Sequence, residues 1–214
     1  MVSRVLSDYQ RLKNDESDDS LFYSQPRFVH HLDEGFRSSL TMLYRERIPQ
    51  ESILLDLMSS WVSHLPEDLK YKRVIGHGLN QTELERNKRL NTFWIQDLNK
   101  DWRLPIDDCS IDYCLMVAAW QYLKYPEEIS SEIIRSLSPN GKIIVSFSNR
   151  AFWDKTPNIW RNGTDDEHVQ YVKSILYSQG FTDIEVVMQK GESKGIYKRL
   201  GVTGDPFFSV IAKK

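Results

Sequence analysis

Carboxylates and small polar residues follow two of the short apolar runs in this sequence. Asp56 lies near the end of run 53–57, and Ser59 and Ser60 follow the run after Met58. A carboxylate at a strand tip can face an ammonium group, while the serines either cap a helix or leave its N-terminus open to a carboxylate. Asp97 follows run 92–96, where it can accept a hydrogen bond from an exocyclic amine such as that of adenine, or cap a local turn.

Three further runs end near residues suited to ligand contact. Run 73–76 ends at Gly76, which permits close backbone approach or simply a turn, and continues into His77 and Gly78. Run 111–118 leads to an aromatic segment, and run 142–146 leads to a polar one. In an open α/β sheet, ligands bind beyond the carboxyl ends of the strands, so these ends together predict one site.

The elements that must position this site follow from the spacing of apolar residues. The five runs are short and rich in Ile, Val and Leu, as strands buried on both faces of a parallel sheet are. Helices are predicted between them at 60–69, 81–89 and 126–137, which gives βαβ units. A helix at 166–179 and two strands at 183–189 and 206–213 follow, and the last two strands predict an antiparallel hairpin at the sheet edge.

The first 50 residues are predicted to form an acidic segment and a lid-like helix, and residues 51–214 a single domain. The helix is expected from Pro26 onward, on the helical spacing of five apolar residues, Phe28, Leu32, Phe36, Leu40 and Leu43. Residues 14–20 carry four carboxylates that repel one another, so this stretch is expected to be mobile.

Composition excludes several classes of function. The chain has 214 residues and a formal net charge of -2, without a basic run, so nucleic acid is not an expected partner. No apolar stretch is long enough to span a membrane, and the acidic N-terminal segment lacks the apolar region typical of a secretory signal. Two cysteines are too few for a disulfide framework or a zinc site, and the five histidines lack metal-ligand spacing. These features predict a cytoplasmic protein without a bound metal.

The ordered series of strand ends resembles the small-molecule class I S-adenosylmethionine-dependent methyltransferases. The resemblance rests on Leu55-Asp56, Val74-Ile75-Gly76, Gln96-Asp97-Leu98, Ser110-Ile111-Asp112 and Leu137-Ser138-Pro139-Asn140-Gly141. It covers residues 52–146 well and Gly180-Phe181 loosely. It implies an α/β fold, with a Rossmann-like seven-stranded, mostly parallel sheet, helices on both faces and an antiparallel last strand. The implied cofactor is S-adenosyl-L-methionine.

The resemblance also implies roles for particular residues. Asp56 would lie near the methionine ammonium, Asp97 and Leu98 would meet the adenine, and Asp112 would be structural. The full set of implied cofactor contacts is Asp56, Met58, Ser59, Gly76, His77, Gly78, Asp97, Leu98 and Val117. Two positions depart from the family: residues 58–61 contain no glycine, and Gly78 replaces the acid that binds the ribose. His77 or Asn80 are the candidates to replace that acid.

Candidate substrate contacts lie on the N-terminal segment and after the fourth and fifth strands. They are Tyr23, His30, Trp120, Tyr122, Asn149 and Trp160, together with Arg27 and Trp153. A surface helix for the N-terminal residues, and core packing for Trp120, are the competing interpretations. The sequence lacks a Gly-x-Gly-x-x-Gly after the first strand and a nucleophile elbow.

The predicted activity is methyl transfer from S-adenosylmethionine to a small or medium organic molecule, by direct displacement. Such transfer needs alignment and a dry site more than a strong base. His77, His30, Tyr122 or Asn149 could assist the nucleophile. The alternative is a non-catalytic binding or scaffold protein that keeps this fold without the cofactor. The oligomeric state is not predicted.

Overall fold

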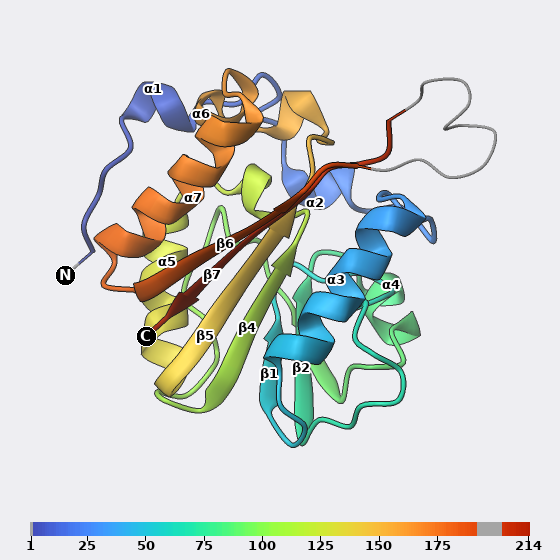
Figure 1. Cartoon of the computed structure of the whole chain (residues 1–214). Helices are drawn as coiled ribbons and strands as arrows, with labels where there is room; N and C mark the ends of the chain where they lie inside the picture. Colours follow the sequence, from blue (N-terminus) through green and yellow to red (C-terminus); the bar gives the residue numbers. More distant parts are fainter. Residues whose placement is uncertain (1, 192–202) are drawn as a thin grey trace.

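The computed structural model describes residues 2–191 and 203–214. The strands of these residues form one seven-stranded sheet in the order β3-β2-β1-β4-β5-β7-β6 (Figure 1). Strands β3, β2, β1, β4 and β5 run parallel, and β7 runs antiparallel to both of its neighbours. The predicted fold class is therefore confirmed, including the antiparallel closing hairpin.

Each predicted strand exists. β5 begins at Leu137, five residues before its predicted start, and the other strand ends shift by at most two residues. The strands are β1 (Ile53–Asp56), β2 (Arg73–Gly78), β3 (Thr92–Ile95), β4 (Ile111–Val117), β5 (Leu137–Phe147), β6 (Thr182–Gln189) and β7 (Phe207–Lys213). As expected, β1 lies between β2 and β4, with Leu55 aligned with Ile75 on one side and Cys114 on the other. Asp112 has the structural role that the resemblance implies, because its carboxylate accepts hydrogen bonds from Ile53 N and Ser138 Oγ.

Two helical layers cover the sheet. On one face, α3 (Glu34–Arg47) packs a cluster that includes Phe36 and Leu40 against β1, β4, β5 and β7. On the other face lie α5 (Pro126–Ser136) and α7 (Asp165–Ser178). The remaining helical segments are α1 (Asp8–Arg11), α2 (Asp19–Phe22), α4 (Gln81–Arg86), α6 (Asn158–Arg161) and two 3-10 turns, η1 (Trp120–Tyr122) and η2 (Trp153–Lys155). No helix of residues 2–191 and 203–214 has the length and apolarity to cross a membrane.

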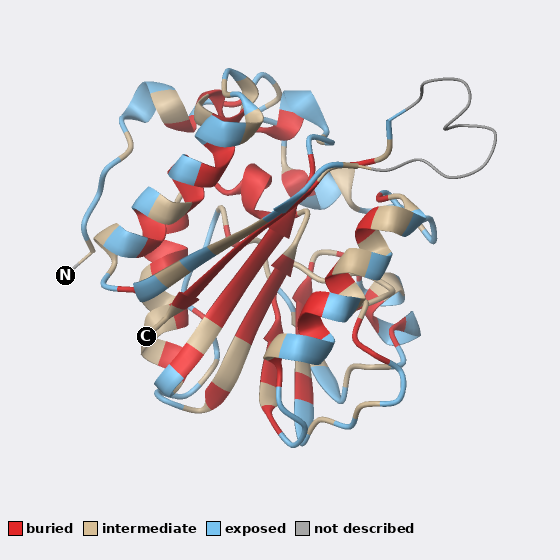
Figure 2. Cartoon of the chain, viewed as in Figure 1, coloured by how far each residue is buried: buried red, intermediate tan, exposed pale blue. Residues whose placement is uncertain are grey.

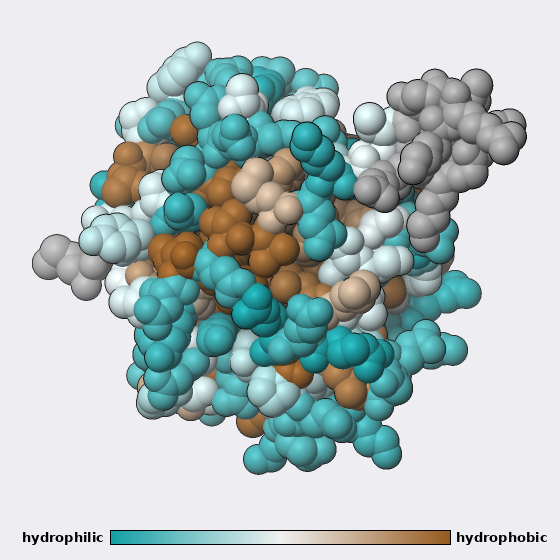
Figure 3. Space-filling model, in the orientation of Figure 1, coloured by the Kyte–Doolittle hydropathy of each residue, from teal (hydrophilic) through white to brown (hydrophobic). Residues whose placement is uncertain are grey.

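Burial follows the two layers. Figure 2 shows buried residues concentrated in the central strands and on the inward sides of the helices, with exposed residues along their outer sides. On the face seen in Figure 3, apolar side chains gather over the strands between α3 and α7, and hydrophilic ones surround them.

Two helix predictions are wrong. Residues 60–69 form no helix. Pro66 disfavours helical backbone at the residue before it, and His64 (φ 54°) has a left-handed backbone, as does Met58 (φ 56°) just before this stretch. Residues 26–33 are also not helical. The helix of this region begins only after Asp33, whose carboxylate caps it by accepting a hydrogen bond from Phe36 N at 2.8 Å.

The acidic segment 14–20 is paired with lysines in the structure. The ammonium group of the buried Lys155 lies 3.0 Å from a carboxylate oxygen of Asp15 and 3.3 Å from one of Asp19, and Lys13 lies 2.9 Å from Asp19. The Lys155 ammonium also donates to the backbone oxygen of Ser17. The lysines that neutralise this segment come partly from distant positions, so local charge repulsion does not decide its structure.

Candidate active site at the carboxyl ends of the strands

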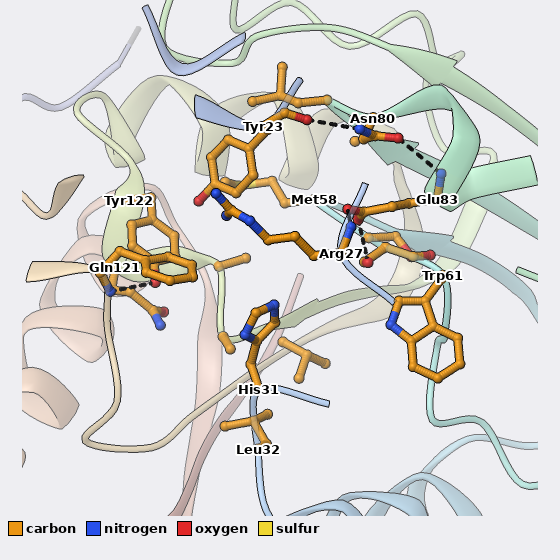
Figure 4. A pocket seen from close by; sticks show the side chains of 18 of the residues that line it. Tyr23, Arg27, His31, Leu32, Met58, Trp61, Asn80, Glu83, Gln121 and Tyr122 are labelled. Carbon is orange, nitrogen blue, oxygen red and sulfur yellow. Dashed lines mark hydrogen bonds between the residues drawn. The ribbon is translucent and has the colours of Figure 1, made fainter. Parts of the chain in front are cut away.

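One cavity of about 520 Å³ lies beyond the carboxyl ends of β1, β2, β3 and β4. This volume is within the range of roughly 300–1,000 Å³ typical of small-molecule sites. Residues 19–32, which we call the roof segment, and residues 149–153, which follow β5, also line it. Figure 4 shows side chains from these elements converging on the cavity.

Asp56 is the buried carboxylate of the cavity floor. Its residue is only 4 % exposed, and its oxygens accept hydrogen bonds from Ser59 Oγ at 2.6 Å and from the Ser63 side chain. No lysine, arginine or histidine in the described part of the chain forms an ion pair with it. Burial raises the pKa of Asp56 to about 6. The group is therefore a buried acid that lacks a cationic partner.

The loop after β1 folds directly onto the end of β2. Met58 N donates to His77 Nδ1 at 3.1 Å, and Ser59 N donates to the His77 backbone oxygen at 2.6 Å. A Cβ atom at Gly78 would lie 2.6 Å from the backbone oxygen of Ser59. The missing side chain of Gly78 therefore makes room for the protein's own loop. The side-chain amide of Asn87 holds the same loop by donating to Ser60 O at 2.9 Å.

The side chains of His77 and Asn80, the two candidates to replace the missing ribose acid, both line the cavity and form hydrogen bonds within the protein. Because His77 Nδ1 accepts a hydrogen bond, Nε2 carries the proton and donates to Gln96 O at 2.9 Å. Burial lowers the pKa of His77 to about 4, which keeps the ring neutral. Asn80 caps α4 by accepting from Glu83 N, and its amide donates to the backbone oxygens of two roof residues.

Glu83 is a cavity carboxylate that the sequence reasoning missed. It lies in the first turn of α4 and accepts hydrogen bonds from Ser60 Oγ at 2.5 Å and from Arg27 N at 2.7 Å. The pattern Asn80-x-x-Glu83 at a helix start was the available signal, since an acid at that position reaches back over the helix N-terminus.

The ends of β3 and β4 complete the floor. Asp97 accepts a hydrogen bond from Asn99 N at 2.9 Å, and Leu98 and Val117 line the cavity beside it. Ala118 has a left-handed backbone (φ 48°), a strained conformation for a residue with a Cβ atom. All the implied cofactor contacts line the cavity except Gly76. That residue lies within β2, and its missing side chain makes room for Leu90.

Four of the six candidate substrate contacts line the cavity: Tyr23, His30, Tyr122 and Asn149. Trp120 and Trp160 do not. Each is 1 % exposed and belongs to the core, and Trp160 stacks on His168 with ring centroids 3.9 Å apart. The polar sequence around Trp160 hid this packing, because the stacking partner comes from the following helix. Trp153 does line the cavity, as expected, and so does His31, which was not singled out from the sequence.

A family model described as "Methyltransferase domain" matches residues 59–145. No sequence among the curated proteins matches the chain. Among solved structures, an S-adenosylmethionine-dependent methyltransferase from Thermotoga maritima has a TM-score of 0.61 at 18 % identity, over 84 % of this chain and 90 % of that one. One from Archaeoglobus fulgidus has a TM-score of 0.57 at 16 % identity, over 83 % and 94 %.

Phosphoethanolamine N-methyltransferase 2 of Haemonchus contortus, solved with S-adenosyl-L-methionine, has a TM-score of 0.59 at 15 % identity. The match covers 86 % of this chain and 54 % of that one. At these identities the structures establish the shared fold, and the family model adds a match in sequence. The chain thus has the fold of these S-adenosylmethionine-dependent methyltransferases, and its residues 59–145 are similar in sequence to a methyltransferase domain.

Proposed function

We propose that this chain binds S-adenosylmethionine in the cavity and transfers its methyl group to a small or medium organic molecule. The observation that carries the proposal is Asp56, a buried carboxylate at the end of the central strand that has no cationic partner among residues 2–191 and 203–214. An isolated buried charge is costly, and an ammonium group of a ligand would compensate it. The methionine part of the cofactor carries such a group.

The other contacts fit the cofactor in part. Asp97 lines the cavity and is 11 % exposed at its side chain, so it can accept a hydrogen bond from the adenine amine beside Leu98. Gly78 offers no side chain to the ribose. Glu83 supplies a carboxylate from the helix that follows β2, and we assign the ribose hydroxyls to it. Met58 and Val117 provide apolar walls between these polar ends.

When bound, the cofactor supplies an electrophilic methyl group, and this chain's residues orient the acceptor and exclude water. The roof segment closes the cavity over the floor, which favours alignment in a dry site. Burial raises the pKa of Tyr23 well above its ordinary range and that of Tyr122 to about 12, so both hydroxyls stay protonated. Burial and the nearby Arg27 lower the pKa of His31, which leaves a neutral imidazole able to accept a proton near pH 7.

Calorimetric titration with S-adenosylmethionine and S-adenosylhomocysteine tests the proposal. We expect the wild type to bind both. Asp56→Asn should weaken binding by about tenfold to a hundredfold, the value of a hydrogen bond to a charged group. Asp101→Asn is the matched control, because Asp101 belongs to the loop after β3 but does not line the cavity. A wild type that binds neither compound at millimolar concentration would instead support a methyltransferase fold used for binding or scaffolding.

A further inference from the structure

Arg27 extends from the roof segment into the cavity. In Figure 4 its side chain crosses from the side of Glu83 and Trp61 toward that of Tyr122. The guanidinium carbon lies 4.4 Å from the ring centroid of Phe22, 5.6 Å from that of Tyr23 and 5.3 Å from that of Phe152. The positive charge is therefore held among aromatic rings rather than in bulk water.

The guanidinium is incompletely paired. Arg27 Nη2 donates to Phe22 O at 3.1 Å, whereas Nη1 is buried and has no hydrogen-bond partner. Within residues 2–191 and 203–214 no carboxylate forms an ion pair with it, and Glu83 accepts from the backbone nitrogen of Arg27 rather than from its side chain. A buried donor left without an acceptor costs free energy, so the conformation is one that a ligand would complete.

The other arginines of the cavity differ. Arg150 forms an ion pair with Asp205, and Arg37 donates to the backbone oxygen of Asp33. Gln121, which is buried beside Tyr122, also has an unpartnered atom, its side-chain oxygen. This end of the cavity thus offers a positively charged donor and a neutral acceptor next to flat rings.

We propose that Arg27 binds a carboxylate of the methyl acceptor, so that the substrate is a small organic acid with a flat or apolar body. The inference rests on the proposed function. A guanidinium matches a carboxylate in both charge and geometry, and stacking on Tyr122 and Phe152 would hold the body of the acid. A phosphate dianion fits less well, because Arg27 is the one cavity cation whose buried donor lacks a partner in the described residues.

The methionine part of the cofactor also carries a carboxylate, so two ligands could supply the partner of Arg27. Asp56, assigned to the methionine ammonium, lies at the end of β1. The rings around the Arg27 guanidinium include Phe152, which follows β5, and Phe152 stacks with Tyr122, which follows β4, at a distance of 6.1 Å between ring centroids. The guanidinium thus lies toward the β4–β5 side, away from the β2 and β3 ends assigned to the adenosine.

The test compares matched acids and amides without cofactor. Phenylacetate and phenylacetamide are titrated into the wild type, Arg27→Gln, Arg27→Lys and the control Arg103→Gln, an exposed arginine that does not line the cavity. We expect the wild type and Arg103→Gln to bind phenylacetate about tenfold to a hundredfold more tightly than the amide, the value of a charge-assisted hydrogen bond. Arg27→Gln should bind the two equally, and Arg27→Lys should retain part of the preference. The proposal would be overturned if the wild type bound phenylacetate and phenylacetamide equally, or if Arg27→Gln still preferred phenylacetate.

A second titration identifies the source of the carboxylate. S-adenosylhomocysteine carries the amino acid, and 5′-methylthioadenosine lacks it. If Arg27 serves the substrate, Arg27→Gln binds both nucleosides as the wild type does. Selective loss of S-adenosylhomocysteine affinity would place the cofactor's own carboxylate on Arg27 and overturn the substrate assignment. Because the acid titration needs no cofactor, failure of S-adenosylmethionine binding remains distinguishable from failure of this inference.

Discussion

Two buried aspartates line the same cavity, one in the roof segment and one in the floor, and their surroundings differ. Asp19 lies between Lys13 and Lys155, both of which are 2 % exposed at their side chains. In the part of the chain that the structure describes, the side chain of Asp56 has only hydroxyl donors, those of Ser59 and Ser63. A carboxylate compensated by cations of its own chain stabilises the fold, whereas an uncompensated one is available to a ligand. The difference identifies the floor, rather than the roof, as the place where a cationic group should bind.

The largest expected effect comes from removing the charge of the roof aspartate. Asp19→Asn leaves two buried lysines with an incomplete partner, and breaking a buried pair costs about 3–5 kcal/mol. We expect urea denaturation to give a free energy of unfolding that is lower than that of the wild type by this amount. Asp183→Asn is the control, because Asp183 is 76 % exposed at its side chain and 3.8 Å from Lys213. If Asp19→Asn were as stable as the wild type, burial of the two lysines would not require the charge of Asp19.

The floor aspartate should respond in the opposite direction. Its pKa is raised from 3.8 to about 6, so its favourable contribution is present below pH 3.8 and is lost as the pH rises through 6. Above pH 6 the buried charge opposes folding, by about 3 kcal/mol for a shift of this size. Asp56→Asn should therefore be more stable than the wild type at pH 7.5, and the advantage should vanish near pH 4.

Urea denaturation at both pH values measures this prediction. An Asp56→Asn protein that is less stable at pH 7.5 would assign Asp56 a structural role like that of Asp19. The comparison between roof and floor would then fail, and with it the main support for an ammonium site.

Asp97 has a more distant cationic neighbour than Asp19, whereas Asp56 has none among the described residues. Of the three substitutions, the one at Asp97 should have the smallest effect. Asp97 accepts a turn hydrogen bond from Asn99 N, and Lys100 lies 3.7 Å away. Asp97→Asn keeps an oxygen for the turn but presents an amide N–H where the adenine amine would donate. We expect S-adenosylhomocysteine binding to weaken by about 1–2 kcal/mol, with the thermal midpoint nearly unchanged. A lower midpoint with unchanged affinity would show that Asp97 only caps the turn.

The sequence was sufficient to predict the sheet and most of the floor. Strands buried on both faces are short apolar runs, and parallel strands bring their carboxyl ends together, so Asp56, Asp97 and Val117 could be placed at one edge. At residues 58–61 and Gly78 the sequence showed only that the chain departs from the methyltransferases it resembles. It did not show that the loop after β1 would fill the space at Gly78 with its own backbone.

What could not be predicted depends on contacts between distant residues. Residues 60–69 lie between two strands, where a helix was expected, but Pro66 disfavours helical backbone there and Asn87 binds the Ser60 carbonyl. The acidic segment is paired with Lys155, far along the chain. Trp160 is buried by His168 rather than exposed in its polar surroundings. In each case long-range partners override the local preference.

The roof segment is fastened near both of its ends. Asp19 is held by two lysines, and at the other end Asp33 and Asp205 exchange backbone hydrogen bonds of 2.8 Å and 2.7 Å with each other's carboxylates. In kinetic terms, a ligand that enters or leaves beneath the roof needs only the middle of this segment to move, because both anchors can stay in place. The barrier to exchange is then set by the few contacts between the anchors, such as those of Arg27 with its aromatic neighbours, and an occupant of the cavity that binds Arg27 would lengthen its own residence time.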